Sequence, residues 1–288
     1  MSKTSRTLVC VLVVVLVVLS MSNVFLYNRT ADLSKENNEL MVRSEMPLIL
    51  AQLESQVDSE LWRLDESLLA SCQQLSSTGL VGTQASAILN SLVASDSFIV
   101  NAATIDKNDV IVAVEPAKYS SIEGADISDQ EQSIRLQKTM RPVMSNVIRL
   151  VEGFDGVVMA APIFTVDKVF TGSLSIVIEP SVLLEAVATQ VLNGTSYTAW
   201  AMQIDGKIIY DHDPAQQGKM LFSDPIYKDY PELLTLGRKI SAERSGYGTY
   251  QYYKTLESGQ VVKKEAYWTT IGAYDTEWRL VIIHLMTE

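Results

Sequence analysis

An uncharged run covers residues 7–27, and two basic residues, Lys3 and Arg6, precede it. As an α-helix this run would extend about 30 Å at about 1.5 Å per residue, which is enough to cross a bilayer. Basic residues favour the cytoplasmic side of a membrane. The sequence therefore predicts a cytoplasmic stub at 1–6, a transmembrane anchor at 7–27 and an extracytoplasmic remainder. A cleaved signal peptide is the alternative, because the apolar run 8–19 has signal-peptide length.

The composition of the chain excludes some functions. Lys and Arg together number 23 against 34 Asp and Glu, for a net charge of −11 over 288 residues. Nucleic-acid binding needs clustered cations that displace phosphate counterions, so a nucleic-acid partner is not expected. Apolar residues make up 47% of the chain, so it can form a packed core. Its length suits one large domain or two ordinary ones.

A helical stripe follows the apolar run. Apolar side chains recur at spacings of three, four or seven residues, which places them on one face of a helix. We expect a long helix over 31–76, with a break or kink at Pro47 because proline lacks a backbone N–H. Trp62 lies off the stripe and is expected to pack on a second element. The stripe consists of Leu50, Val57, Leu61, Leu64, Leu68, Cys72 and Leu75.

Strand-like runs begin near Ser97 and occur in two similar series, each with helical segments between the strands. "ATIDKNDVIVAVEPAKYSSIEG" parallels "MQIDGKIIYDHDPAQQG", so that Asp106 matches Asp205 and Gly124 matches Gly218. Farther on, "EGFDGVVMAAP" parallels "SGYGTYQYY", and "TGSLSIVI" parallels "TEWRLVII". A period this long is not that of a solenoid repeat. It predicts two similar domains in series.

The order of these motifs resembles the double Cache family of PAS-like extracytoplasmic sensor domains. The most specific stretches are "VEPAKYSSIEGADIS", "RPVMSNVIRLVEGFDGVVMAAPIF", "GKIIYDHDPAQQGKMLF" and "KEAYWTTIGAYDTEWRLVI". The resemblance implies an α+β fold with a transmembrane helix, a long helix and two tandem PAS-like modules built on antiparallel sheets. The membrane-distal module would cover 77–180 and the membrane-proximal module 181–288.

The resemblance also implies a function: a small organic molecule bound in the distal module and a signal passed to other proteins. Many family members continue into a second transmembrane helix and an output domain. Neither follows here, so a separate signalling protein is the expected partner, and the long helix could support a homodimer. The arginine–aromatic pair of amino-acid-binding members is absent after "GADIS", which disfavours an amino-acid ligand. The alternatives are a capture protein working with a transporter and a structural protein with degenerate pockets.

Asp211, His212 and Asp213 invite a metal or catalytic interpretation. Alternate side chains of a strand point to opposite faces, so His212 would point away from the two aspartates. Asp213 before Pro214 is also typical of a strand exit. The matching stretch "VAVEP" has no histidine. No known catalytic or phosphate-binding motif occurs. We therefore predict no catalytic residue, no metal, no cofactor and no enzyme activity.

Candidate ligand-binding residues remain in both modules. Arg141 and Arg149, if both point inward, would make a cationic pocket for a carboxylate. If not, they are solvated or pair with Glu152 and Asp155. In the proximal module, aromatic residues on strands could form a pocket or belong to the core. The distal candidates are Tyr119, Arg135, Arg141, Arg149, Asp155, Met159 and Phe164, and the proximal ones are Trp200, Tyr210, Tyr252 and Tyr267.

Overall fold

The chain begins with one long helix, and strands that alternate with short helices follow it. A computed structural model describes residues 3–286, with side chains from Leu19 onward except Asn38. The helices are α1 (Lys3–Thr78), α2 (Thr83–Ser95), α3 (Glu131–Thr139), α4 (Pro180–Leu192) and α5 (Pro231–Ala242), with 3-10 turns η1 (Ala117–Ile122), η2 (Pro214–Gln216) and η3 (Pro225–Tyr227). The strands are β1 (Ile99–Asp106), β2 (Ile111–Glu115), β3 (Val143–Met144), β4 (Ile148–Arg149), β5 (Asp155–Phe164), β6 (Phe170–Ile178), β7 (Thr198–Gln203), β8 (Ile208–Asp211), β9 (Gly246–Tyr253), β10 (Val261–Ala273) and β11 (Thr276–Leu285).

Helix α1 confirms the predicted stripe, since every residue of the stripe is buried. The predicted break at Pro47 does not occur, because Pro47 lies inside α1 and a proline removes only one hydrogen bond from a helix that has many. The expectation that Trp62 packs on a second element was wrong. Trp62 is 64% exposed, because it lies on the face of the helix opposite the buried stripe.

The predicted anchor over 7–27 begins outside the residues whose side chains the structure describes. Among the residues that are described, no helix combines the length and the apolar character needed to cross a bilayer. The chain divides into two compact units, residues 1–48 and 49–288, and all of the strands belong to the second unit.

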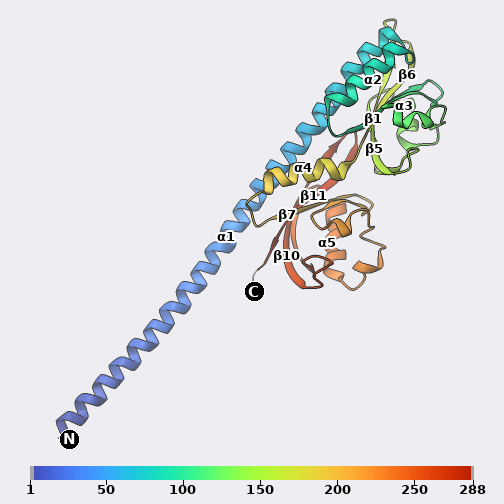
Figure 1. Cartoon of the computed structure of the whole chain (residues 1–288). Coiled ribbons are helices and arrows are strands. Elements are labelled where there is room, and N and C mark those ends of the chain that lie inside the picture. Colours follow the sequence, from blue (N-terminus) through green and yellow to red (C-terminus); the bar gives the residue numbers. More distant parts are fainter. Residues whose placement is uncertain (1–2, 287–288) are drawn as a thin grey trace. The chain divides into compact units, whose positions relative to one another are not determined.

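Two antiparallel sheets make up this unit, as predicted (Figure 1). The first module contains α2, α3 and a sheet in the order β2-β1-β6-β5-β3, with β4 paired to β5. The second module contains α4, α5 and a sheet in the order β8-β7-β11-β10-β9. When β4 is left out and the strands are numbered within each module, both sheets have the order 2-1-5-4-3. The two sheets are therefore consistent with two tandem modules of similar architecture.

The repeated turns also match in detail. Asp106 Oδ1 accepts hydrogen bonds from the backbone N–H groups of Asn108 (2.8 Å) and Val110 (3.0 Å), and Asp205 Oδ1 accepts one from Lys207 (2.9 Å). These are the turn-stabilising bonds that aspartate favours. One sequence match was wrong. "EGFDGVVMAAP" forms β5, which pairs with β6, so its counterpart in the sheet is β10 and not β9.

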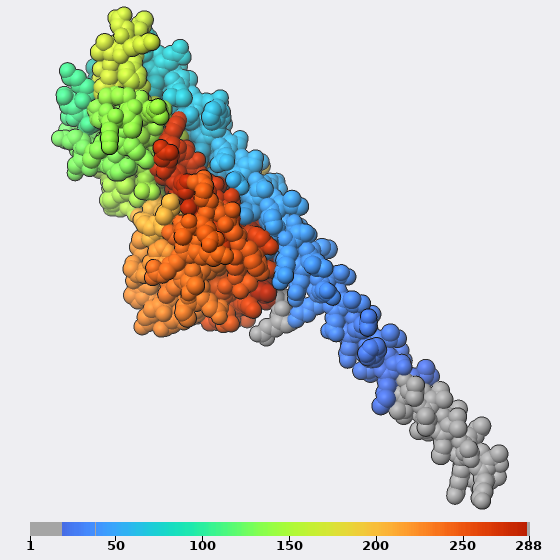
Figure 2. Space-filling view, turned by 180° about the vertical axis from the view of Figure 1, so that it is seen from behind, coloured from blue at the N-terminus to red at the C-terminus, as the bar shows by residue number. Residues whose placement is uncertain are grey.

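The turn between β10 and β11 joins the parts of this unit. Tyr274 and Asp275 both have positive φ values (53° and 68°), as a two-residue hairpin turn requires. The Tyr274 hydroxyl hydrogen-bonds to Asp65 of α1. Thr276 donates to the carbonyl of Met144 in the first module. The red tip of this hairpin accordingly lies between α1 and the green first module in Figure 2. Movement in the second sheet can therefore reach both α1 and the first module.

Helix α5 covers the second sheet with Leu233, Leu236 and Ile240, which are buried at helical spacing. Its C-terminal end is held by Arg279 of β11, whose side chain is 3% exposed. The guanidinium donates to the carbonyls of Ile240 (3.1 Å) and Glu243 (3.2 Å). It thus satisfies carbonyls that a helix end leaves without partners.

Replacing Arg279 by Met should lower the free energy of unfolding by about 2 kcal/mol, because buried carbonyl groups lose their donors. Arg244→Met is the matched control. Arg279 and Arg244 both pair with Glu277. The Arg244 side chain is 69% exposed, so its replacement should lower the free energy of unfolding by less than about 1 kcal/mol. Urea unfolding of the two variants measures both values. Equal effects would show that Arg279 does not support α5.

Candidate functional site

The first module holds a small cavity between its sheet and the segments that cover it, lined mainly by apolar side chains with a few polar ones. The cavity has a volume of about 30 Å3. Its floor includes Asn101 of β1 and Ser175 of β6, and Gln132 of α3 lines it as well. A second cavity of about 20 Å3, also lined by Gln132 and Ser175, adjoins it. A single water needs about 10–15 Å3 of such space, so a larger molecule would require the covering loops to move.

Two buried amides give this cavity its chemistry. Asn101 is 1% exposed and Gln132 is 2% exposed. The Asn101 Nδ2 donates to Glu152 Oε1 at 2.7 Å, which directs its oxygen elsewhere. Asn101 Oδ1 and Gln132 Oε1 have no hydrogen-bond partner among the described residues. Buried acceptors without partners are costly, so these oxygens are suited to a ligand that donates hydrogen bonds.

The predicted distal residues do not line either cavity. Met159 is fully buried but shares a strand with Val158, which does line both cavities, and alternation places the two on opposite faces. Tyr119 packs beside the core around Ile111, and Phe164 contacts Phe170 with ring centroids 5.9 Å apart.

The predicted cationic pocket is not formed. Arg141 and Arg149 are exposed, since Arg141 lies in the turn before β3 and Arg149 on a peripheral two-residue strand. Arg149 pairs instead with Asp155 at 3.4 Å, as its alternative interpretation predicted. Asp155 also pairs with Lys207 of the second module at 2.9 Å. Arg135 donates to the carbonyl of Met144 and to the hydroxyl of Thr276 in the second module, the latter at 3.4 Å. Asp155 and Arg135 therefore lie at the junction between the modules.

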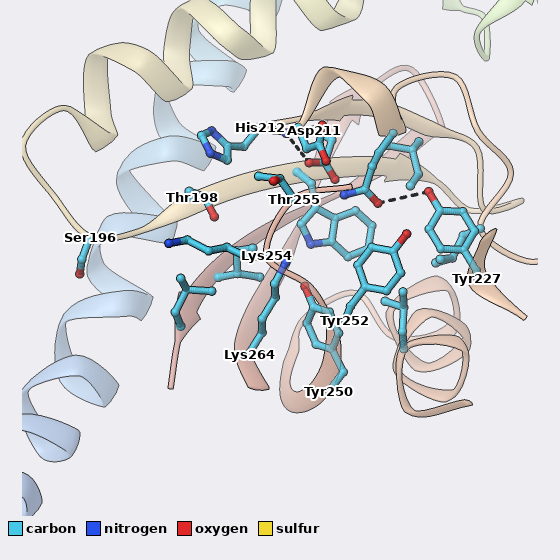
Figure 3. Close-up of a pocket in the computed structure, with 18 residues that line it drawn as sticks. Ser196, Thr198, Asp211, His212, Tyr227, Tyr250, Tyr252, Lys254, Thr255 and Lys264 are labelled. Atoms are coloured by element: carbon cyan, nitrogen blue, oxygen red, sulfur yellow. Dashed lines mark hydrogen bonds between the residues drawn. The ribbon is translucent and has the colours of Figure 1, made fainter. Parts of the chain in front are cut away.

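The second module contains a larger pocket of about 110 Å3 between its sheet, η2 and α5 (Figure 3). One face of the sheet, the face covered by α5, forms a wall of the pocket. The side chains of Trp200, Lys264 and Tyr252 all lie on this face. Apolar side chains of α5 and β11 close the inner end, including Leu233 and Ile283. The volume corresponds to several water-sized groups.

Two opposite charges face this pocket. Lys264 is 4% exposed, and burial lowers the pKa of its ammonium group. Asp211 ends β8, and burial among aromatic side chains raises the pKa of its carboxyl group to about 7. No hydrogen bond or ion pair within 4 Å joins the two among the described residues. Lys264 is thus buried and Asp211 partly buried without either gaining the other as a close partner, which is unfavourable for both charges.

Aromatic groups complete the pocket. The Tyr252 side chain is 2% exposed, and its hydroxyl has no hydrogen-bond partner in the part of the chain that the structure describes. The Lys264 ammonium lies 5.8 Å from the centroid of the Tyr252 ring and 5.9 Å from that of Tyr250. The Tyr227 hydroxyl donates to Gln216 Oε1 at 3.3 Å, and this pair forms another wall. The pocket therefore presents a free ammonium and a free hydroxyl beside apolar rings.

The strand-exit interpretation of the acidic stretch is confirmed. Asp213 Oδ1 accepts from the Ala215 N–H at 3.2 Å and so begins η2, while Oδ2 accepts from Leu256 N–H at 2.7 Å. His212 is exposed at the edge of the pocket. Among the described residues, no group of three side chains could hold a metal ion. What the sequence interpretation missed is that Asp211 faces a pocket as well as a turn.

Of the four aromatic candidates in this module, Trp200 and Tyr252 line the pocket. Tyr210 is buried in β8 but does not line the pocket. The Tyr267 ring contacts the Tyr247 ring, with centroids 4.7 Å apart. Tyr267 immediately precedes Trp268, whose side chain belongs to the core on the pocket face, so alternation directs Tyr267 away from it.

Comparisons with known proteins agree with this geometry. Residues 59–180 match the model of the HK/GC/chemotaxis protein-like sensor domain family. The comparison with curated proteins gives no match. An extracellular ligand-binding receptor from Desulfohalobium retbaense is 33% identical, with a TM-score of 0.70. The alignment covers 83% of this chain, which spans only 40% of that one.

Two more distant solved structures share the fold. The ligand-binding domain of the Pseudomonas aeruginosa amino acid chemoreceptor PctB, in complex with L-Gln, is 14% identical with a TM-score of 0.57 and coverage of 83% and 89% of the two chains. That of the Campylobacter jejuni chemoreceptor Tlp3, with 4-methylisoleucine, is 12% identical with a TM-score of 0.60 and coverage of 84% and 90%. These three relatives are ligand-binding receptors or the ligand-binding domains of chemoreceptors. The chain is thus similar to receptor sensor domains of the double Cache type, the resemblance that its motifs predicted, and residues 59–180 carry the match to the sensor-domain family.

Proposed function

We propose that this chain is a membrane-anchored, non-enzymatic sensor that binds a small organic molecule in its first module and signals through a partner protein. The observation that carries the proposal is the pair of unpartnered, buried amide oxygens of Asn101 and Gln132, two residues that line the same cavity. A ligand with N–H or O–H donors would satisfy both. Because the described cavity walls offer no free cation, a neutral amide, an amine or a nucleobase suits this site better than the organic acid expected from the arginines.

Ligand binding would act by moving the cover of the cavity. The cavity is too small for such a molecule as it stands, so a bound state needs the segments around Ile127 and Val151 to move outward. A ligand that binds only the opened form shifts the population toward it. The first module contacts α1 through Ala161, whose carbonyl accepts from Cys72 Sγ at 3.8 Å. Opening of the cavity would thereby bias the position of the long helix against the sheet.

Thermal unfolding of the full chain in a panel of small amides, amines, nucleobases and carboxylates tests this function. A ligand at about 100 times its Kd should raise Tm by roughly 5–10 °C. Asn101→Ala should abolish that rise. Asn90→Ala is the control, since Asn90 is exposed on α2 and bonds only to its own helix. A panel with no active compound, or an unchanged rise in Asn101→Ala, would overturn the proposal.

A further inference from the structure

The pocket of the second module has features that packing alone does not explain. Lys264 and Tyr252 are both more than nine-tenths buried, and both line the pocket. The Tyr252 hydroxyl has no hydrogen-bond partner among the described residues, and the Lys264 ammonium lies over the rings of Tyr250 and Tyr252. A lysine kept only for packing would extend to water or pair with a carboxylate. Lys264 forms no ion pair with a carboxylate among the described residues, although Asp211 lines the same pocket (Figure 3).

The groups facing the pocket divide into a donor side and an acceptor side. The Lys264 ammonium and the Tyr252 hydroxyl are the donors on the side of the sheet, and the hydroxyl has no hydrogen-bond partner among the described residues. Asp211 provides the acceptor. One of its carboxylate oxygens accepts a hydrogen bond from the Asp213 N–H at 2.7 Å, and the carboxylate has no other hydrogen-bond partner among the described side chains. Asp213 is already occupied through both its oxygens. Lys254 and His212 are exposed at the rim.

A ligand that fits must therefore carry an anion and a donor at once. A carboxylate would accept from Lys264 and Tyr252, which are the kind of charge-assisted partners that bind carboxylates strongly. A hydroxyl or ammonium group a few bonds away would donate to Asp211. The small apolar part would lie against Trp200 and Ile283. Filling the pocket this way gives each buried charge the partner that it lacks.

We propose that the second module is a second ligand site, independent of the first-module cavity, and that it takes small carboxylic acids bearing a hydroxyl or ammonium donor. Hydroxy acids and amino acids share this chemistry. The two sources differ in the charge of the donor, so their dependence on Asp211 should differ. An ammonium group gains an ion pair with the carboxylate, whereas a hydroxyl gains only a hydrogen bond.

Calorimetric titration of the full chain with four three-carbon probes tests the site: L-lactate, L-alanine, propionate and isopropylamine. L-lactate, L-alanine or both should bind, with propionate at least about tenfold weaker because Asp211 then lacks a donor. Isopropylamine should not bind measurably. If Asp211→Asn weakens the binding of L-alanine more than that of L-lactate, the site is suited to amino acids. The reverse order indicates a site for hydroxy acids.

Matched variants locate the binding. Lys264→Met and Tyr252→Phe should each weaken the best probe by at least about tenfold. Lys263→Met and Tyr253→Phe should leave it unchanged, because Lys263 is exposed on the opposite face of β10 and Tyr253 does not line the pocket. Tyr252→Phe removes one oxygen only, so it remains informative if Lys264→Met folds poorly.

The outcomes separate this proposal from the function of the first module. Asn101→Ala should bind these acids as the wild type does, even if the first site has no ligand. The second site is refuted if none of the four probes binds, or if Tyr252→Phe and Lys264→Met bind as tightly as their controls. Propionate binding as tightly as L-lactate and L-alanine would refute the role of Asp211.

Discussion

Asp211→Asn should make the protein more stable than the wild type at pH 8, by about 2–4 kcal/mol, and should give no such gain at pH 4. The physical reason is the burial of the Asp211 carboxyl group, which raises its pKa from an unfolded value near 3.8 to about 7. A group whose pKa is higher in the folded state stabilises the fold below its unfolded pKa, and this contribution is lost as the pH rises through the folded pKa. A pKa that is higher by one in the folded state changes the free energy of unfolding by about 1.4 kcal/mol. The asparagine side chain of the variant is neutral at every pH tested.

Urea unfolding of both proteins at pH 4, 6 and 8 measures this difference. Asp155→Asn is a control of opposite sign. The ion pair with Lys207 at 2.9 Å lowers the pKa of Asp155, so its stabilising contribution is present at neutral pH and is lost as the pH falls. A difference between wild type and Asp211→Asn that does not change with pH would show that Asp211 is not buried in the way described.

Gly172→Ala should lower the free energy of unfolding by about 3 kcal/mol or more. Gly172 lies opposite Asp106 in the β1–β6 pair with a φ of +151°, a conformation that residues with a side chain rarely adopt. A Cβ atom there would lie 2.1 Å from the carbonyl oxygen of Ile105 and 2.8 Å from Leu80 Cδ1. The carbonyl belongs to the neighbouring strand, so relief requires the central strands of the first sheet to separate.

Gly79→Ala separates the cost of the clash from the cost of the backbone angle. Gly79 follows α1 with a φ of +86°, and a Cβ there would meet no atom within 4 Å. Its replacement should cost about 1 kcal/mol, which is the usual cost for such a backbone angle. Chemical unfolding of both variants makes the comparison. A Gly172 variant no less stable than the Gly79 variant would contradict the strand pairing of β1 and β6.

Much of the fold could be predicted because it depends on local patterns. The stripe from Leu50 to Leu75 and the repeated turns at Asp106 and Asp205 are short-range features, and each formed as expected. The match of β5 to β9 failed because strand pairing is a long-range property, and two strands of similar composition can occupy different places in a sheet.

The sites were harder to predict for a related reason. Arg141 and Arg149 are charged and close in sequence, but the direction of a side chain depends on the sheet to which its strand belongs. Lys264 and Asp211 lie far apart in the chain, and only the order β8-β7-β11-β10 brings them to one pocket. One local signal was present: Asn101 is a single amide within the apolar run "SFIVNAATID". A polar side chain in a buried strand needs a partner, and that requirement points to the cavity.

The claim that both modules bind small molecules is tested most directly by calorimetric titration of the full chain beside an Asn101→Ala/Lys264→Met double variant. The titrants are the panel of amides, amines and nucleobases, and the three-carbon acids. Saturable binding of one compound from each group to the wild type, absent from a double variant that still unfolds cooperatively, is the predicted result. A wild type that binds nothing, or a double variant that binds equally well, would contradict the account.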